Sequence, residues 1–369
     1  MIKLNESTYC PRLFSFFDTN KNGACCRIDE KFLRFSNFKE MVDDPEHKKL
    51  TADLALFGKK NEACAGCWYE ESLGIFSLRK QALGFFTNNN IEYPRQNKLM
   101  FLTIDTGNNC NLACRTCAPA VSSGWWKETN TFNEDQNWGS ASVRELNLAY
   151  WLLEDLSNVS KILILGGEPF LDTKHLTLLE EIFRQRGDSN VQVHYVTNAT
   201  IKLSQRHREV LSKIKGLQIG LSIDAIEDRF HYIRTGGHWQ DVVENIKDYR
   251  TLNSTVKIGV NVTVSIYNVL YLNEVFNWAS DNDFILDFMF AYSPFWVSFK
   301  TLDTDRKHKV IEKLQQSNHD MSAIIHHIND VEHDKDSYMA FVIETIRTEK
   351  FRKLKLADYL PELSNIMFS

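Results

Sequence analysis

The sequence predicts an α/β protein whose core is a parallel barrel of six strand–helix repeats, either closed or open at one side. From residue 98 onward, short apolar runs alternate with segments whose apolar residues recur at helical spacing. The run Ile162-Leu163-Ile164-Leu165 is apolar on both faces, which is typical of a strand buried in a parallel sheet. Right-handed crossovers between such repeats place the strands at the centre and the helices outside.

The expected elements follow one another in a regular order. The strands lie at residues 98–106, 161–165, 191–197, 217–224, 256–265 and 285–292. Helical patterns lie between them at residues 173–184, 204–214, 239–252 and 270–280. Parallel α/β folds bind their ligands at the carboxyl ends of the strands, so the residues that follow each strand are the candidates for a functional site.

Two segments flank the barrel, which we assign to residues 98–300. Residues 1–92 are loop-rich, and their Asn20-Lys21-Asn22-Gly23 signal suits a hairpin turn between short strands. Residues 301–369 have a helical, charged pattern that predicts a C-terminal extension. An apolar stripe in this extension predicts a packing surface, and it runs through Ile343, Ile346, Phe351 and Leu354, with Leu356, Tyr359 and Leu360 beyond it.

Composition and charge narrow the class of protein. The 369 residues carry a formal net charge of −5, which disfavours a protein that coats nucleic acid electrostatically. The basic residues in 202–215 and 347–355 are expected to lie on solvated helix faces, with a local basic groove as the alternative. No apolar run reaches the ~18 residues of a membrane-spanning helix, and the first residues lack the apolar core of a signal peptide. We therefore expect a cytoplasmic protein with no membrane partner.

The eight cysteines fall into groups. They are Cys10, Cys25, Cys26, Cys64, Cys67, Cys110, Cys114 and Cys117, and none follows residue 117. Because cytosolic reductants keep thiols reduced, a disulfide framework is not expected there. Grouped cysteines in that compartment usually bind metal.

Cys110, Cys114 and Cys117 form a C-x3-C-x2-C pattern in the loop after the first barrel strand. Three thiolates can hold a four-iron cluster and leave one iron without a protein ligand, so that a small molecule can bind there. The alternative is a structural zinc site, which needs a fourth ligand. No further cysteine or histidine follows this group until His175, so the spacing favours the cluster.

With this pattern the chain resembles the radical S-adenosylmethionine (SAM) superfamily. The resemblance implies a partial (β/α)6 barrel of the TIM type, a [4Fe–4S] cluster and SAM bound to the open iron. It also implies that the reduced cluster cleaves the C5′–S bond of SAM and that the resulting radical abstracts a hydrogen from a substrate. The departure is Thr116, where many members have an aromatic or large apolar residue. A backbone contact between Thr116 and adenine would survive that change, but stacking would not.

The second strand ends in Gly166-Gly167-Glu168-Pro169. Two glycines allow a close approach of the backbone to a ligand, and a carboxylate can accept bonds from an ammonium group. A tight turn is the alternative for this sequence taken alone. The run resembles the superfamily's glycine-rich motif, which implies a contact with the amino group of SAM.

Polar residues also follow the third and fourth strands. Asn198 is either a turn residue or, by the resemblance, a contact to the SAM ribose or the substrate border. Ser222 and Asp224 share one face of a strand, and buried polar groups there need partners. The resemblance assigns Ser222 and Arg234 to SAM, with a surface salt bridge as the alternative for Arg234. Asp224 is our catalytic candidate, facing either SAM or the substrate.

The N-terminal cysteines suggest a second metal site. Cys64 and Cys67 have ordinary metal-ligand spacing, and Cys10 with Cys25 or Cys26 would complete four ligands, since neighbours on a strand point to opposite faces. A zinc ribbon is the alternative to an auxiliary [4Fe–4S] cluster. The arrangement resembles radical SAM proteins with an N-terminal twitch (SPASM-like) domain, which also show runs similar to Ser122–Trp126 and to Pro361-Glu362-Leu363.

The expected activity is therefore radical SAM chemistry, with a flavodoxin or ferredoxin as the reductase. We expect a peptide or small-metabolite substrate, and a nucleotide or hypermodified DNA base is the alternative. A non-catalytic iron–sulfur electron carrier is the alternative of another class, and the Gly166–Pro169 motif argues against it because an electron carrier needs no small-molecule pocket. On the fifth strand, Asn261 or Thr263 is expected to line the cavity.

Overall fold

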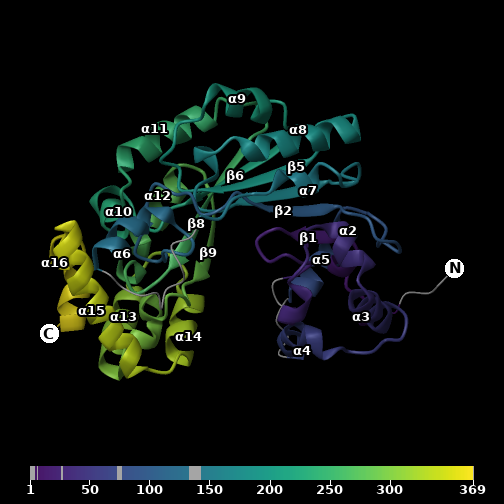
Figure 1. Ribbon diagram of the computed structural model, residues 1–369. Coiled ribbons are helices and arrows are strands. Elements are labelled where there is room, and N and C mark those ends of the chain that lie inside the picture. Colours follow the sequence, from purple (N-terminus) through teal and green to yellow (C-terminus); the bar gives the residue numbers. More distant parts are fainter. Residues whose placement is uncertain (1–4, 6, 26–27, 73–76, 133–142, 369) are drawn as a thin grey trace.

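The computed structural model describes residues 5, 7–25, 28–72, 77–132 and 143–368, and its centre is one parallel sheet of seven strands (Figure 1). The strands lie in the order β1-β2-β4-β5-β6-β8-β9, and every neighbouring pair is parallel. Their bounds are β1 (Phe16–Asp18), β2 (Phe101–Asp105), β4 (Lys161–Leu165), β5 (Gln192–Thr197), β6 (Gly216–Ser222), β8 (Lys257–Val264) and β9 (Ile285–Phe290). The last six confirm the six strands expected from the sequence.

The seventh strand, β1, comes from the N-terminal segment and was not expected in this sheet. It pairs with β2, and the ring of Phe16 stacks on that of Phe101 with centroids 4.0 Å apart. The predicted turn follows β1 and closes through a backbone bond of 2.9 Å from Asp18 N–H to the Gly23 carbonyl. Only an isolated bridge joins the two sides of this turn, so β1 is used as an edge strand of the main sheet instead of as half of a hairpin.

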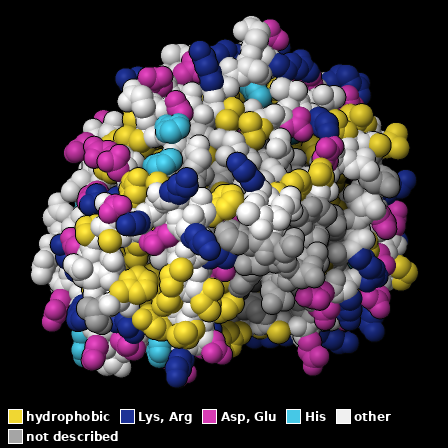
Figure 2. Space-filling model, turned by 60° about the vertical axis from the view of Figure 1, so that its left-hand side comes forward, with side chains coloured by type: hydrophobic (Ala, Val, Ile, Leu, Met, Phe, Trp, Pro, Cys, Tyr) yellow, Lys and Arg dark blue, Asp and Glu magenta, His cyan; other side chains and the backbone are white. Residues whose placement is uncertain are grey.

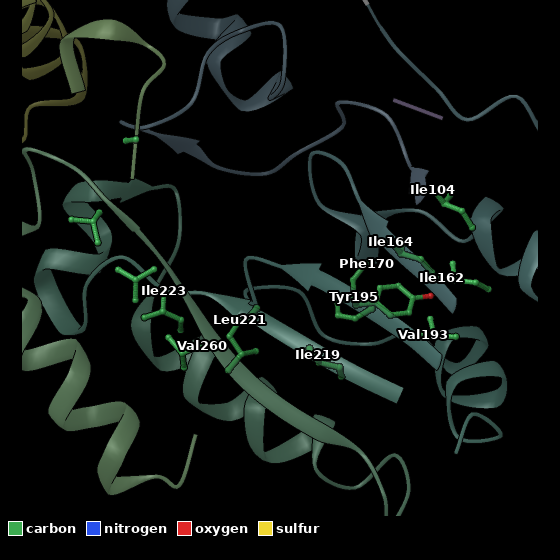
Figure 3. Close-up of a cluster of buried hydrophobic side chains, with 14 of the residues drawn as sticks. Ile104, Ile162, Ile164, Phe170, Val193, Tyr195, Ile219, Leu221, Ile223 and Val260 are labelled. Carbon is green, nitrogen blue, oxygen red and sulfur yellow. The ribbon is translucent and has the colours of Figure 1, made fainter. Parts of the chain in front are cut away.

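Helices cover one face of the sheet, as Figure 1 shows along its upper side. These helices are α8 (Lys174–Arg186), α9 (Gln205–Leu211), α11 (Trp239–Tyr249) and α12 (Leu272–Asp281), and they confirm the four predicted helical patterns. The core between these layers contains the side chains that Figure 3 labels, among them Ile162, Ile164 and Tyr195. Burial alternates along β4 and β5, so the other face of these strands is only half-buried.

The remaining helices form groups near the two ends of the chain, below the sheet in the view of Figure 1. The N-terminal group is α1 (Arg12–Ser15), α2 (Phe38–Asp43), α3 (Pro45–Ala55), α4 (Ala65–Ser72) and α5 (Leu78–Asn88). The C-terminal group is α13 (Thr304–Leu314), α14 (Ser322–Asp330), α15 (Lys335–Arg352), α16 (Leu356–Tyr359) and α17 (Pro361–Phe368). Short elements α6 (Trp126–Phe132), α7 (Leu148–Trp151), α10 (Glu227–Ile233), β3 (Ala113–Cys114) and β7 (Arg234–Thr235) connect the strands. No helix in the described ranges is long and apolar enough to cross a membrane.

The orientation of α15 corrects part of one expectation, because Leu356 and Leu360 of the predicted packing surface are buried but its two isoleucines are not. Ile343 and Ile346 of the predicted packing stripe are 57% and 59% exposed, so they face solvent. The buried side chains of this helix are mostly polar, and they are Ser337, Phe341, Glu344, Thr345 and Thr348. Figure 2 shows apolar side chains gathered low on the face that is turned forward. Helical periodicity identifies residues that share a face, but the partner across the interface decides which face is buried.

Candidate active site

The three cysteines of the C-x3-C-x2-C pattern lie in the segment after β2, of which we call residues 107–117 the cysteine loop. Cys110 precedes β3, Cys114 is the last residue of β3, and Cys117 follows it. Cys114 is buried, and Cys110 and Cys117 are half-buried. Burial and the neighbouring Cys114 raise the pKa of the Cys110 thiol to about 11. Contact with Cys117, together with burial, raises the pKa of the Cys114 thiol. The three sulfur atoms therefore lie in one neighbourhood, at the carboxyl end of the sheet.

The run Ser122–Trp126 fixes the shape of this loop. The Ser123 hydroxyl accepts a 3.0 Å bond from the Cys110 N–H, and the Trp125 indole donates a 3.0 Å bond to the Cys114 carbonyl. A Cβ at Gly124 would lie 2.2 Å from the Leu112 carbonyl oxygen, so only glycine fits there. The run therefore fixes the backbone of the cysteine loop at Cys110 and at Cys114.

The Gly166–Pro169 loop lies directly against the cysteine loop. The Gly167 N–H donates to the Gly107 carbonyl and the Glu168 N–H to the Asn109 carbonyl, each at 2.8 Å. Gly166 has φ 145°, in the region that favours glycine. A Cβ at Gly167 would lie 2.4 Å from the Asn109 carbonyl oxygen. Both glycines are therefore needed for the contact between the two loops.

Glu168 is 1% exposed and joins this loop to the end of β5. One oxygen accepts a 2.8 Å bond from the Thr197 hydroxyl, and the other accepts a 2.7 Å bond from the Asn198 N–H. Burial raises the pKa of this carboxyl, while the N–H groups that it accepts from oppose the shift. Pro169 is also buried and begins a short turn of 3-10 helix. Among the predicted residues of this motif, Glu168 has the most polar contacts.

Asn198 lies beside the cysteine loop, as its predicted role requires. Its amide nitrogen donates a 3.0 Å bond to the Asn111 side chain and lies 4.0 Å from Cys110 Sγ. Its amide oxygen accepts from the Thr200 N–H, which is the turn contact expected under the alternative interpretation. The turn contact is therefore confirmed, whereas a contact with the SAM ribose or the substrate stays a prediction.

Asp224 and Arg234 form a buried ion pair at the end of β6. Their side chains are 2.9 Å apart and are 0% and 9% exposed, so Arg234 is not part of a surface salt bridge. Asp224 also accepts a 2.8 Å bond from the Thr263 N–H. Burial raises the pKa of Asp224, and Arg234 and the Thr263 N–H oppose that shift. The Arg234 guanidinium lies 3.9 Å from Cys114 Sγ, which connects the pair to the cysteine loop.

The positions of the other predicted residues do not test their predicted contacts with SAM. Ser222 is half-buried at the end of β6, level with Asn261 of β8. Asn261 and Thr263 are both half-buried and share the same side of β8. Thr116 is half-buried between Arg115 and Cys117. For these residues the roles toward SAM stay predictions.

Sequence reasoning missed Asn268, which is fully buried next to this site. Its amide nitrogen donates 3.0 Å bonds to the carbonyls of Asp224 and Thr263, and thereby joins the ends of β6 and β8. Its amide oxygen accepts from the Ser265 N–H at 2.8 Å. A polar Ser-x-x-Asn sequence directly after an apolar strand was the available signal.

Four N-terminal cysteines line one small cavity, together with Trp68 and Arg79. These cysteines are Cys10, Cys25, Cys64 and Cys67, whereas Cys26 lies outside the described residues. Burial and the neighbouring thiols raise the pKa of Cys10 to about 12, and the same causes raise the pKa of Cys64. Within the described residues, no three His, Cys, Asp or Glu side chains are arranged to hold a single metal ion.

The comparisons with known proteins concern the same region. Residues 104–275 match the family described as the radical SAM superfamily. The GTP 3′,8-cyclase of Peptoclostridium acidaminophilum is 26% identical over 227 residues, which are 59% of this chain and 65% of that protein. The S-adenosylmethionine-dependent nucleotide dehydratase of Fibrobacter sp. (strain UWH6) is 26% identical over 172 residues, 43% of this chain and 46% of that protein. The chain therefore matches only part of each relative.

Solved structures show a distant likeness. Native anSMEcpe with bound AdoMet is 19% identical, with a TM-score of 0.42 and coverage of 53% of both chains. Streptococcus suis SuiB bound to precursor peptide SuiA is 16% identical, with a TM-score of 0.39 and coverage of 69% of this chain and 58% of that chain. The assignment rests instead on the family match, on the parallel sheet and on the enzymes among the relatives. Residues 104–275 therefore constitute a radical SAM superfamily domain.

Proposed function

We propose that this chain is a radical SAM enzyme that holds a [4Fe–4S] cluster on Cys110, Cys114 and Cys117. The observation that carries the proposal is the contact of the cysteine loop with three other segments of the chain, which contain Glu168, Asn198 and Arg234. Glu168 follows β4, Asn198 follows β5, and Arg234 follows helix α10. A protein that only carried electrons would have no need for polar side chains converging beside an open iron.

The residues present fit the cluster and SAM. Three thiols that have no fourth cysteine beside them in the described part of the chain suit a cube with one open iron. Arg234 has a buried Nε with no partner among the described residues, so its guanidinium can still donate to a carboxylate. Glu168 offers carboxylate oxygens that can also accept from an ammonium group. When bound, the cluster and SAM would supply one-electron cleavage of SAM and abstraction of a substrate hydrogen.

Each residue then has a distinct task. Gly166 and Gly167 bring the backbone close to the cysteine loop and leave room for SAM. Asp224 holds the Arg234 guanidinium in place, so we assign it a positioning role instead of proton transfer. Asn198 and Ser222 border the ribose, and Thr116 contacts adenine through its backbone.

We also propose that the N-terminal segment binds an auxiliary [4Fe–4S] cluster. Cys10, Cys25, Cys64 and Cys67 supply four thiols to one cavity, so this site would leave no iron open. That is the arrangement expected of a twitch-like module and of a cluster that passes electrons. Structural zinc is the alternative, and metal analysis of anaerobically purified protein separates the two: zinc with about four irons would establish zinc there.

For the substrate we propose a small metabolite, with nucleotides as the first class to screen. The two curated relatives described above are named for reactions of nucleotides. A peptide remains within the proposal, while DNA is disfavoured. Arg206 and Arg208 of the first basic segment form ion pairs with Glu180 and Asp248, so their charges are already compensated. Positive and negative side chains are also mixed over the face in Figure 2.

The proposed place of action is the cytosol, where a flavodoxin or ferredoxin would reduce the cluster. The cluster assignment is tested by electron paramagnetic resonance of anaerobically reconstituted protein reduced with dithionite. Addition of SAM should change the spectrum of the cluster at the open iron, and the Cys110→Ala/Cys114→Ala/Cys117→Ala variant should lack that change. A wild-type spectrum that SAM leaves unaltered would count against the proposal.

Substrate class is tested separately by SAM turnover in the presence of nucleoside triphosphates, peptides or single-stranded DNA. Stimulation by a nucleotide alone would support the preferred class. Tight DNA binding that falls steeply with salt would instead show several phosphate contacts and would overturn the preference.

A further inference from the structure

Arg115 lies inside the cysteine loop, between Cys114 and Thr116, and is only 2% exposed. Among the described residues this cation has no carboxylate as an ion-pair partner, and its Nη2 has no hydrogen-bond partner. Burying a charge without compensation costs free energy, so a buried arginine without a carboxylate partner suggests that another anion compensates its charge. Other buried arginines near the loop do have carboxylate partners, since Arg234 pairs with Asp224 and Arg352 with Glu128.

The contacts of Arg115 hold its guanidinium in one place. Nε donates a 3.1 Å bond to the Tyr232 carbonyl, and Nη1 donates a 2.6 Å bond to the Thr348 hydroxyl. The guanidinium lies 3.8 Å from the centroid of the Tyr232 ring and 5.6 Å from that of Tyr267. Ring faces attract a cation but do not neutralise its charge. The positive charge therefore remains, held between Tyr232 and Thr348 on a residue whose backbone directly follows Cys114.

Helix α15 explains the position of this side chain. Its buried face presents Thr345 and Thr348 toward the interior, while Ile343 and Ile346 face solvent. A helix that turns its polar face inward needs polar partners there, and Arg115 is the partner of Thr348.

A second set of interactions joins the end of the same helix to the cysteine loop. Arg352 pairs with Glu128 at 2.6 Å, and its guanidinium lies 4.6 Å from the Trp125 ring centroid. Trp125 in turn donates to the Cys114 carbonyl. The polar face of α15 thus contacts the cysteine loop or its neighbours at two places, through Thr348 and through Arg352.

The anion that this cation can stabilise is the cluster itself. A four-iron cube bound by three thiolates carries a net negative charge, and reduction adds another. Net charge around such clusters is one of the terms that set their reduction potential. A fixed cation in the cysteine loop stabilises the reduced form more than the oxidised one, because the reduced form is more negative.

We propose that Arg115 is a positioning residue that raises the reduction potential of the cluster, with α15 holding its charge beside the cysteine loop. This inference rests on the proposed function, since it requires the cluster on Cys110, Cys114 and Cys117. No bond is formed or broken in the step concerned. One electron from the reductase enters the cluster, and Arg115 lowers the free energy of the product.

The test compares Arg115→Gln with Arg115→Lys in the reconstituted holoprotein. At a fixed solution potential, Arg115→Gln should lower the ratio of reduced to oxidised cluster about tenfold, which is 59 mV for one electron. Arg115→Lys keeps the charge and should stay within about threefold of wild type. Arg306→Gln is the matched control, because Arg306 also stacks on a tyrosine, 4.3 Å from the Tyr338 ring centroid, but bonds to residues of the C-terminal helices. It should leave the ratio unchanged.

The readouts separate this inference from the proposed function. Iron content and the SAM-induced spectral change report on the function, while the potential reports on Arg115. A wild-type protein without a cluster would overturn both. A loaded Arg115→Gln protein with the wild-type potential would overturn only the inference. If Arg115→Gln does not retain iron, Arg115→Met decides, because it also removes the charge and keeps a long side chain that can fill the same space. A fall in the reduced fraction then supports the inference, and an unchanged fraction overturns it.

Discussion

Replacing Asp224 with asparagine tests the ion pair that we regard as the support of the SAM site. The substitution preserves the size of the side chain and an oxygen that can accept from the Thr263 N–H. It removes the negative charge that lies 2.9 Å from Arg234. Because both side chains are buried, the guanidinium would be left without a carboxylate in a poorly solvated site.

The expected loss of stability follows from that burial. Two unit charges at about 4 Å attract by about 4 kcal/mol at an effective dielectric constant of about 20. Breaking a buried pair typically costs about 3–5 kcal/mol, because one charge stays uncompensated. Folded domains are stable by about 5–15 kcal/mol, so the variant should still fold. Its urea midpoint, followed by tryptophan fluorescence in the apoprotein, should fall by roughly 1–2 M.

A double variant separates the structural contribution of the pair from its role in binding. Asp224→Leu/Arg234→Met removes both charges, and such replacements are often neutral for stability. It should recover most of the stability that Asp224→Asn loses, yet it should bind SAM poorly because the guanidinium is gone. A loss below about 1 kcal/mol in Asp224→Asn, or wild-type SAM affinity in the double variant, would refute this reasoning.

Three further predictions follow from the structure. Gly167→Ala should push the cysteine loop away, because the added Cβ would lie 2.4 Å from a backbone oxygen, and the variant should therefore retain less iron. Gly187→Asn is the control, because Gly187 lies in open space at a helix end. Burial lowers the pKa of His175 from 6.5 to about 3, so its stabilising effect is complete above pH 6.5 and is lost as pH falls. Urea titrations should therefore show that His175 accounts for about 2 kcal/mol of the unfolding free energy that the wild type loses between pH 7.5 and 5. The His175→Gln variant should lose less unfolding free energy over the same range. Parallel curves of unfolding free energy against pH for the two proteins would contradict this. Finally, Cys64→Ala/Cys67→Ala should reduce iron from about eight to about four per chain, and an unchanged content would exclude the N-terminal cluster.

Much of the barrel could be predicted because its signals are local. The six strands after residue 98 are apolar runs of ordinary strand length, and four of the helices between them show a clear apolar face. The rule that ligands bind at the carboxyl ends of parallel strands then placed the candidate residues without a structure. Glu168, Asn198 and Arg234 follow three different elements, yet all lie beside the cysteine loop.

What could not be predicted depends on contacts between distant parts of the chain. β1 has only three residues and becomes a strand through pairing with β2, 85 positions later in its register. Arg115 meets Thr348 across 233 positions, and this contact turns the polar face of α15 inward. The periodicity of α15 does not indicate that partner. Ile343 and Ile346 were therefore expected on the buried face of the helix, whereas they lie on its exposed face.

The choice between Cys25 and Cys26 shows the same limit of local reasoning. Alternation along an extended segment says that the two side chains point apart, but not which of them points inward. In the structure, Cys25 lines the cavity with Cys10, Cys64 and Cys67, while Cys26 lies outside the described residues, so the choice between the two stays a prediction.

The central claim is tested most directly by the release of 5′-deoxyadenosine and methionine from SAM. Anaerobically reconstituted wild-type protein with dithionite should produce both in equal amounts, slowly even without a substrate. The Cys110→Ala/Cys114→Ala/Cys117→Ala variant should produce neither, while it retains about four irons on the N-terminal cysteines. Cleavage of SAM by that variant at the wild-type rate would contradict the assignment of the catalytic cluster.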